Sequence, residues 1–258
     1  MNVIKVDLPT ELKSIELHTL ADLHIGDKFA NQEKIHATIN QIRDTENAYC
    51  ILNGDLMNNA TKTSVSDSYA EKFSPMQQIE MCVELLAPIR QKIIAINQGN
   101  HEYRTYKNDG VDITKVIAME LGVVDRYSPT SSVIFLRLGK QSPHHKSLPV
   151  QYTIFCLHGA GGGRKEGAKA IRLADMASII DADIYIHSHT HLPMIMKQAY
   201  YRTSLASSSI AKVDKLFVNT ASMLEYGGYG EANEFKPNST EGPVIYLQGT
   251  HKEMRAKL

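Results

Sequence analysis

Five short apolar segments of this chain each run directly into residues of the kinds that bind metal ions. These residues are Asp22 and His24 after 15–20, Asp55 after 49–52, Asn100 and His101 after 92–96, His158 after 150–157, and His189 and His191 after 183–186. Apolar runs of this length, bounded by turn residues, predict buried strands. Ligands that follow buried strands belong at the carboxyl edge of a sheet, so the chain must fold to bring these ends together.

The richest of these strand ends is Ile186-His187-Ser188-His189-Thr190-His191. Alternate side chains of an extended backbone point the same way. We therefore expect the run to present imidazoles on one face, where neutral ring nitrogens suit Zn, Mn, Fe and similar ions. The alternative is that one or two polar histidines simply end the strand.

Helical periodicity alternates with the strands. We predict helices over 31–44, 75–91, 111–121 and 168–180, further strands at 2–8 and 131–138, a loop at 58–73 and a turn at 139–148. From Met194 to the C-terminus we expect β-hairpins and loops, with strands at 215–218 and 244–247. Pro88 should end or kink the second helix, and Gly122 should stop the third. His18 lies inside a strand and is expected in the core. This alternation predicts an α/β fold, with residues 1–258 as a single domain.

The composition restricts the class of protein. The chain has 258 residues and a formal net charge of zero, so no global basic field attracts nucleic acid and any polyanion contact must be local. Cys50, Cys82 and Cys156 are too few, and too irregularly spaced, for a disulfide framework. With no signal peptide and no apolar run of membrane-spanning length, this indicates a cytoplasmic protein.

The motifs resemble those of the calcineurin-like metallophosphoesterase superfamily, whose order is D-x-H, G-D, G-N-H-[DE], H and G-H-x-H. In this chain they read Asp22-Leu23-His24, Gly54-Asp55, Gly99-Asn100-His101-Glu102, His158 and Ser188-His189-Thr190-His191. Ser188 stands where the family usually has Gly, which is the only departure. The resemblance covers positions 22–191 and implies a four-layer αββα sandwich.

The resemblance also implies a centre of two divalent metal ions. Asp22, His24, Asp55 and His191 would hold the first ion, and Asn100, His158, His189 and the shared Asp55 would hold the second. His101 would lie near the scissile phosphate and stabilise charge or protonate the leaving oxygen. The mixed N/O ligand set suits Mn, which we expect to support activity best, with Fe, Zn or Ni as alternatives.

Several other residues near the motifs have two interpretations each. Arg104 is a candidate for binding the substrate phosphate, or it forms a surface salt bridge. Arg164 and Lys165 are candidates for the same role, or they merely follow a glycine-rich loop. His187 is expected to support the ligands or the strand rather than to bind metal. Four tyrosines in the last third of the chain could stack nucleobases or pack the sandwich: Tyr200, Tyr201, Tyr226 and Tyr229.

The second motif bears on the substrate. The serine/threonine phosphatase branch carries G-D-x-V-D-R-G, whereas this chain has Gly54-Asp55-Leu56-Met57-Asn58-Asn59, without the second Asp and the Arg. The whole set looks like the small phosphoesterases of phage and bacterial genomes that are labelled DNA-repair-exonuclease-like. We therefore expect a phosphodiesterase that hydrolyses nucleotide or nucleic-acid diesters through a metal-activated water. The alternatives are a DNA exo- or endonuclease proper, and a metal-dependent module that binds phosphate ligands without turnover.

Overall fold

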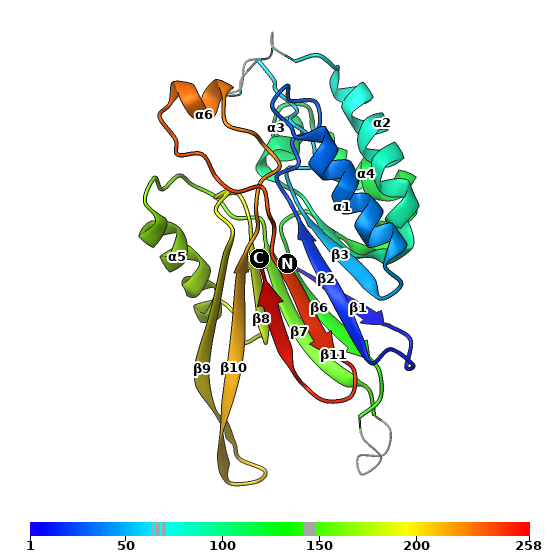
Figure 1. The fold of residues 1–258 in the computed structure, drawn as a ribbon, viewed down its shortest axis with the longest axis vertical. Helices are drawn as coiled ribbons and strands as arrows, with labels where there is room; N and C mark the ends of the chain where they lie inside the picture. The colour runs from blue at the N-terminus through cyan, green and yellow to red at the C-terminus, as the bar shows by residue number, and fades with distance from the viewer. Residues whose placement is uncertain (63, 65–67, 69–70, 142–147) are drawn as a thin grey trace.

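Two six-stranded mixed sheets stack face to face, with helices on both outer faces, in a computed structural model that describes residues 1–62, 64, 68, 71–141 and 148–258 (Figure 1). Sheet A has the order β1 (Asn2–Asp7), β6 (Ser131–Leu138), β7 (Val150–Leu157), β8 (Ile184–His187), β10 (Ser209–Asn219), β9 (Met194–Ser204). Sheet B has the order β12 (Met254–Lys257), β11 (Val244–Gln248), β2 (Ser14–Leu20), β3 (Ala48–Asn53), β4 (Ile93–Asn97), β5 (Tyr127–Ser128).

The helices are divided between the two outer layers. Sheet B is covered by α1 (Gln32–Asp44), α2 (Pro75–Leu86) and α4 (Ile113–Glu120), and sheet A by α5 (Glu166–Asp175) (Figure 1). Two more helices lie beyond the strand ends, α3 (Asn100–Asp109) and α6 (Gly228–Ala232). The described residues also contain short 3-10 turns, η1 (Ala87–Lys92), η2 (Val124–Arg126) and η4 (Met176–Ser178).

Three buried clusters hold these layers together. Residues of both sheets, including Leu17 and Ile154, form the central cluster between the sheets. A second cluster joins sheet B to its helices, and a third joins sheet A to α5 through residues such as Phe155 and Leu173. The predicted four-layer αββα sandwich is therefore confirmed.

The strand directions decide where the motifs lie. β2, β3 and β4 run parallel in sheet B, and β7, β8 and β10 run parallel in sheet A. Backbone hydrogen bonds join the segments that follow these strands, from Asp22 N to Gly54 O and from Ser188 N to His158 O, both at 3.0 Å. The five motif-bearing ends therefore meet at one end of the sandwich.

Local signals were accurate where one or two residues decide a boundary. The Asn31 side chain accepts from Lys34 N and caps α1, α2 ends at Leu86 before Pro88, and Gly122 adopts φ +71° just after α4. All three cysteines are buried and free, as expected. Among the described residues, none of the helices has the length and apolar character needed to cross a membrane.

The structure also contains a helix that the sequence did not indicate, and one predicted helix is shorter than expected. The polar segment after β4 is the helix α3, which begins at the candidate ligand Asn100. The predicted helix 168–180 ends at Asp175, and Ile171 and Ile179 are 62% and 57% exposed. The predicted loop at 58–73 and the turn at 139–148 lie partly outside the described residues.

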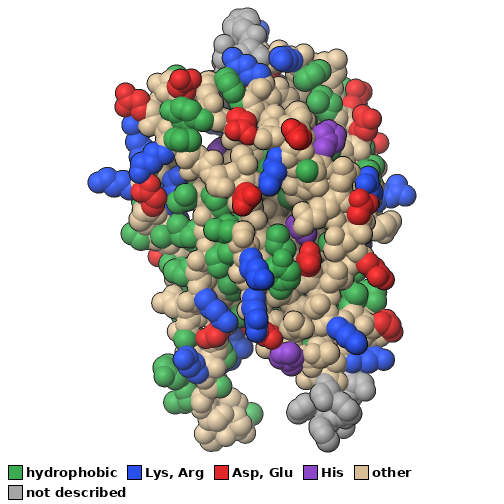
Figure 2. Space-filling model, in the orientation of Figure 1, with side chains coloured by type: hydrophobic (Ala, Val, Ile, Leu, Met, Phe, Trp, Pro, Cys, Tyr) green, Lys and Arg blue, Asp and Glu red, His purple; other side chains and the backbone are tan. Residues whose placement is uncertain are grey.

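The segment after residue 194 forms a hairpin longer than the predicted strand at 215–218. β9 and β10 pair over eleven residues each, and the hairpin projects from the lower end of the sandwich, opposite the motif-bearing strand ends (Figure 1). Hydrophobic side chains are visible on this projection in Figure 2, and Tyr201 and Leu205 are 79% and 96% exposed.

Candidate metal centre

The backbone of the ligand segments is unusual. Five of the seven predicted ligands have a positive φ, between 48° and 66°: Asp22, His24, Asp55, His189 and His191. The left-handed region costs a non-glycine residue about 1–2 kcal/mol, so the surrounding fold must stabilise each of these conformations. The expectation of an extended histidine run was wrong: β8 ends at His187, and His189 and His191 reach the site from left-handed turns.

The first cluster of candidate ligands joins Asp22, His24 and His191, whose ligating atoms lie within 4.8 Å of one another. His191 Nε2 is 3.2 Å from Asp22 Oδ1, and His24 Nε2 is 4.0 Å from the same oxygen. Asp22 and His24 are fully buried, while His191 is half-buried. This cluster brings together the ends of β2 and β8, which belong to different sheets.

The second cluster joins Asp55, His158 and His189 by the same criterion of 4.8 Å. His158 Nε2 lies 3.3 Å from Asp55 Oδ2 and 3.1 Å from Asn100 Oδ1, so the Asn100 amide oxygen also borders this cluster. The His158 ring is oriented from behind, because its Nδ1 lies 2.7 Å from the carbonyl oxygen of Asn53.

A third cluster, His24, Asp55 and His101, lies between the other two. The rings of His24 and His101 meet edge to face, with 4.5 Å between centroids. Asp55 and His24 therefore each belong to two clusters, so the three clusters form one continuous group. The sequence-predicted ligands converge, and His101 lies among them.

His101 is held by hydrogen bonds at its ring and its backbone. Its Nδ1 donates to the Asn58 carbonyl oxygen at 2.6 Å, and its backbone N–H donates to Asp55 Oδ1 at 2.8 Å. Because a carbonyl oxygen only accepts, the proton of the neutral ring resides on Nδ1. His101 Nε2 then points into the site, 3.7 Å from Asp55 Oδ2.

The donor set fits a cation. Among the described residues, both ring nitrogens of His24 are buried without a hydrogen-bond partner, and Asp22 Oδ1 has only the 3.2 Å contact to His191 Nε2. Leaving such groups unpaired in the interior costs about 1–3 kcal/mol each, more for a charged group. Divalent ions bound by carboxylate, amide and imidazole atoms would satisfy them.

The pKa shifts in the group follow from burial and from the packing of opposite charges. Burial, followed by the neighbouring His101 and His191, lowers the pKa of His24 well below its usual 6.5, so its ring is kept in the neutral form that ligates metals. Burial also opposes the charged form of His158, but the Asp55 and Asp22 carboxylates overcome it and raise this pKa to about 10. An ion at this position would displace that proton.

Comparison with known proteins agrees with this geometry. The family described as Calcineurin-like phosphoesterase matches residues 19–193, which include every motif above. The chain belongs to the calcineurin-like phosphoesterase family. No curated protein matches the chain.

Solved structures of low identity cover most of the chain. They include a conserved uncharacterized protein, a predicted phosphoesterase, from Streptococcus pneumoniae (12% identity, TM-score 0.38, 95% of this chain and 90% of that one). Vps29 from Chaetomium thermophilum is 14% identical at a TM-score of 0.43 (94% and 96%). The nuclease MPE of Pseudomonas putida is 11% identical at a TM-score of 0.35 (93% and 87%).

Glu102 of the phosphoesterase motif G-N-H-E has a role that the sequence did not indicate. It is fully buried and accepts backbone N–H groups from Asp55 at 3.1 Å, Met57 at 3.1 Å and Gly99 at 3.0 Å. Burial, followed by the Asp55 charge, raises its pKa to about 7. Glu102 therefore fixes the two turns that carry Asp55 and Asn100, without being one of the grouped candidate ligands itself.

An asparagine network joins the two sheets behind the site. Asn53 Nδ2 donates to Leu157 O at 3.1 Å and to Ser188 Oγ at 2.7 Å, and Asn97 Nδ2 donates to Asn53 Oδ1 at 2.8 Å. This explains the serine that replaces the family's usual glycine, because its hydroxyl accepts from Asn53. The only sign of this network in the sequence was the asparagine at the end of both β3 and β4.

His187 supports the histidine turns from β8. Its Nδ1 lies 2.9 Å from Asn219 Oδ1, and the Asn219 amide donates to Thr190 Oγ1 at 2.9 Å and to Leu192 O at 2.6 Å. A Cβ on Gly159 would lie 2.5 Å from His187 Nε2, so the ring packs against the backbone after β7. These contacts link His187 to the segment that carries His189 and His191.

The three candidate phosphate-binding residues lie in different surroundings. Arg104 borders the site, with its Nη1 3.4 Å from the Asn58 carbonyl oxygen that also holds His101. Arg164 is exposed and lies over the Phe235 ring at 5.5 Å, and Lys165 is exposed at the start of α5. Within the described part of the chain, neither of these two makes an ion pair with a predicted ligand.

The tyrosines after residue 194 do not form one surface. Tyr200 packs against the cluster between sheet A and α5, whereas Tyr201 and Tyr226 are 79% and 49% exposed. The side chain of Tyr229 lies outside the described part.

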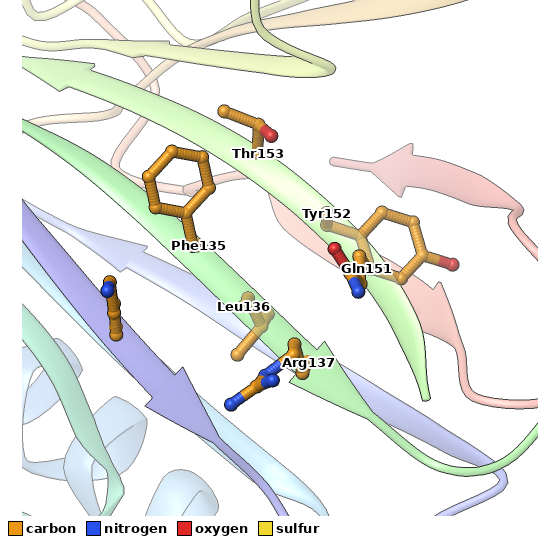
Figure 3. A pocket seen from close by; sticks show the side chains of 7 residues that line it. Phe135, Leu136, Arg137, Gln151, Tyr152 and Thr153 are labelled. Carbon is orange, nitrogen blue, oxygen red and sulfur yellow. The ribbon is translucent and has the colours of Figure 1, made fainter. Parts of the chain in front are cut away.

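A cavity of about 220 Å³ lies elsewhere, on the outer face of sheet A (Figure 3). Its lining contains neither a histidine nor a carboxylate: Lys5, Phe135, Leu136, Arg137, Gln151, Tyr152 and Thr153. It therefore lacks the carboxylates and imidazoles that are grouped at the strand ends.

Proposed function

We propose that this chain is a metal-dependent phosphodiesterase acting on nucleotide or short nucleic-acid diesters. The observation that carries the proposal is the position of Asp55, whose carboxylate belongs both to a cluster with His24 and His101 and to a cluster with His158 and His189. A carboxylate shared in this way is suited to two neighbouring cations.

The donor atoms divide into two sets. Asp22, His24, Asp55 and His191 would hold one ion, and Asn100, His158, His189 and the shared Asp55 would hold the other. Bound ions of this kind acidify a water into a nucleophile and neutralise charge on phosphoryl oxygens. The mixed N/O donor set suits Mn, Fe, Zn or Ni, and we propose Mn as the ion that best supports activity.

His101 is proposed to protonate the leaving oxygen. Its Nδ1–H is engaged by the Asn58 carbonyl oxygen, so the ring presents Nε2 to a substrate, and Nε2 carries the proton for the leaving oxygen when the ring is the imidazolium. The hydrogen bond from Nδ1 to Asn58 O and the one from the His101 backbone N–H to Asp55 Oδ1 hold the residue in place before substrate arrives. A general acid or a charge-stabilising group requires such a fixed position. Arg104, beside the same carbonyl, is proposed to contact a non-bridging phosphate oxygen.

The loop after Asp55 supports a diester rather than a phosphoprotein. The positions that carry a second Asp and an Arg in the serine/threonine phosphatase branch are Asn58 and Asn59. Asn59 Nδ2 donates to His101 O at 2.7 Å and to Thr105 Oγ1 at 2.9 Å. The Asn59 side chain thus positions α3, the Asn58 carbonyl oxygen holds the His101 ring, and neither residue brings a second arginine to the phosphate.

Hydrolysis of bis-p-nitrophenyl phosphate with added Mn tests the proposal. Wild type should turn over and should contain two ions per chain by elemental analysis, and Asp55→Asn should lose both properties. If no hydrolysis occurs with Mn, Fe, Zn or Ni, the proposal is wrong. Labelled single- and double-stranded DNA then separates a nuclease from an enzyme limited to small diesters.

The leaving group separates the role of His101 from that of a ligand. Nitrophenolate departs without a proton, whereas the alkoxide of a thymidine dinucleotide needs one. General acid catalysis contributes about 10²–10⁴-fold. His101→Ala should therefore lose much more activity on the dinucleotide than on bis-p-nitrophenyl phosphate. Equal losses, accompanied by lost metal, would identify His101 as a ligand instead.

A further inference from the structure

An exposed pair of stacked tyrosines lies on α3, the helix that begins at the candidate ligand Asn100. Tyr103 and Tyr106 are each 48% exposed, with ring centroids 5.7 Å apart and 26° between the ring planes. Large aromatic rings exposed side by side are uncommon, since each ring can bury well over 100 Å². Neither ring belongs to the three core clusters.

The helix geometry places this pair beside the candidate metal centre. Asn100, Tyr103 and Tyr106 are spaced by three residues, so they form one row along α3, with about 5–6 Å between successive Cβ atoms. The Asn100 amide oxygen at the head of the row lies 3.1 Å from His158 Nε2. The aromatic row therefore starts at the candidate ligands and leads away from them over the surface of α3.

A row of cations runs alongside the aromatic row. Arg104 and Lys107 follow Asn100 at helix spacings of four and seven, so they lie next to the tyrosines on the same side of α3. Arg104 is half-buried and borders His101 through Asn58, while Lys107 is exposed. Parallel rows of aromatic rings and cations are how proteins hold single strands, with bases stacked on the rings and phosphates beside the charges.

We propose that Tyr103 and Tyr106 are a stacking subsite for the bases of single-stranded nucleic acid. The inference rests on the proposed function, because a strand bound on this row would have a phosphodiester at the metal centre. Arg104 and Lys107 contact the phosphates of the same strand. A base paired within a duplex does not expose its faces to these rings, so the subsite selects unpaired strands.

Binding tests the subsite independently of turnover. The probe is a fluorescein-labelled oligothymidylate, titrated at low salt with metal-free protein and followed by anisotropy. Tyr103→Ala and Tyr106→Ala should each weaken binding about fivefold to 100-fold, and Tyr103→Phe should stay within twofold of wild type because it keeps the ring face. The matched control is Tyr201→Ala, an exposed tyrosine on the projecting hairpin, which should bind as wild type does.

Three binding results would overturn the subsite. They are no detectable binding by wild type, an unchanged Kd for both alanine variants, or an equally tight complex with the labelled strand in a duplex. Unchanged melting temperatures for the alanine variants would establish that any loss is local.

Kinetics then link the subsite to the reaction. Thymidine 5′-(p-nitrophenyl phosphate) and methyl p-nitrophenyl phosphate differ only in the nucleoside, so the ratio of their kcat/KM values measures recognition of the base. The ratio should fall in Tyr103→Ala and keep its wild-type value in Tyr201→Ala. If the ratio is the same in wild type and Tyr103→Ala, the rings do not contact the substrate. Failure of wild type on both esters refutes the phosphodiesterase, and the binding titration still decides the subsite.

Discussion

Replacing Gly99 by alanine should disrupt the metal centre at its tightest contact. A Cβ at this position would lie 2.1 Å from the backbone nitrogen of Asp55, 2.1 Å from Asp55 Oδ1 and 2.8 Å from Glu102 Oε2. The backbone angles of Gly99, φ −96° and ψ 177°, are ordinary for alanine. The whole effect therefore comes from the contact and none from conformational strain.

The expected loss of stability follows from what must move. Overpacking of a rigid interior costs about 1–3 kcal/mol. The displaced turn also weakens the hydrogen bonds from Asp55 N and Gly99 N to the Glu102 carboxylate, at about 1.5 kcal/mol or more each. We expect a total of about 4–6 kcal/mol, which lowers the melting temperature by about 10–20 °C in a chain of this size.

Urea denaturation of the metal-free protein measures the stability, and calorimetric titration with Mn measures the metal. Gly99→Ala should unfold at lower urea and bind fewer ions or bind them more weakly, because the Asp55 carboxylate is displaced. The control is Gly167→Ala in α5, where a Cβ would meet nothing within 4 Å, and it should be neutral or stabilise by up to about 1 kcal/mol. A Gly99→Ala protein with wild-type stability and two tightly bound ions would refute the reasoning.

Three further outcomes are expected. Burial lowers the pKa of His18 from 6.5 to about 4, so between these pH values the unfolded chain binds a proton that the folded chain does not. Stability is therefore lost as the pH falls from 6.5 towards 4, and between pH 7.5 and 5 the unfolding free energy of wild type, measured by urea titration, should fall by about 2 kcal/mol more than that of His18→Gln. Lys92 donates to the carbonyl oxygens of Ile42, Arg43 and Thr45 at the end of α1, so Lys92→Met should lower the unfolding free energy by about 1–3 kcal/mol, and an unchanged value would mean that water replaces these bonds. Chelation with EDTA should lower the melting temperature of wild type and leave that of Asp55→Asn almost unchanged, because only an ion bound to the folded state stabilises it.

The left-handed ligand residues connect the chemistry of the site to its stability. Each strained residue is held by contacts from another segment: His24 N donates to Asp55 O at 3.1 Å, and His189 N donates to Asp22 Oδ2 at 3.1 Å. The ligand turns therefore stabilise one another across the two sheets. Strain concentrated in this way is characteristic of functional sites, where the surrounding fold holds the side chains in place before a ligand binds.

The sequence predicted the strands and most helices well because their signals are local. Apolar runs such as 49–52 and 150–157 favour strands through their own residues. Asn31 acts through its side-chain cap of α1, and Pro88 and Gly122 act through their backbone conformations. The start of α3 was missed because its N-cap is Gly99, without a capping side chain, and because its first residues were interpreted only as ligands. A hairpin after Met194 was expected, but the full length of β9 and β10 was not, because most of their side chains are exposed and carry little apolar pattern.

By itself, the sequence determined which donor atoms are present and which strand end carries each of them, because residue type and strand pattern are properties of short segments. Only the tertiary structure decided how the donors face one another. The left-handed turns at Asp22, Asp55 and His189, and the hold of Glu102 on two separate turns, exist because distant segments hydrogen-bond across the sandwich. No pattern within one segment encodes such contacts, since each depends on where the other sheet lies.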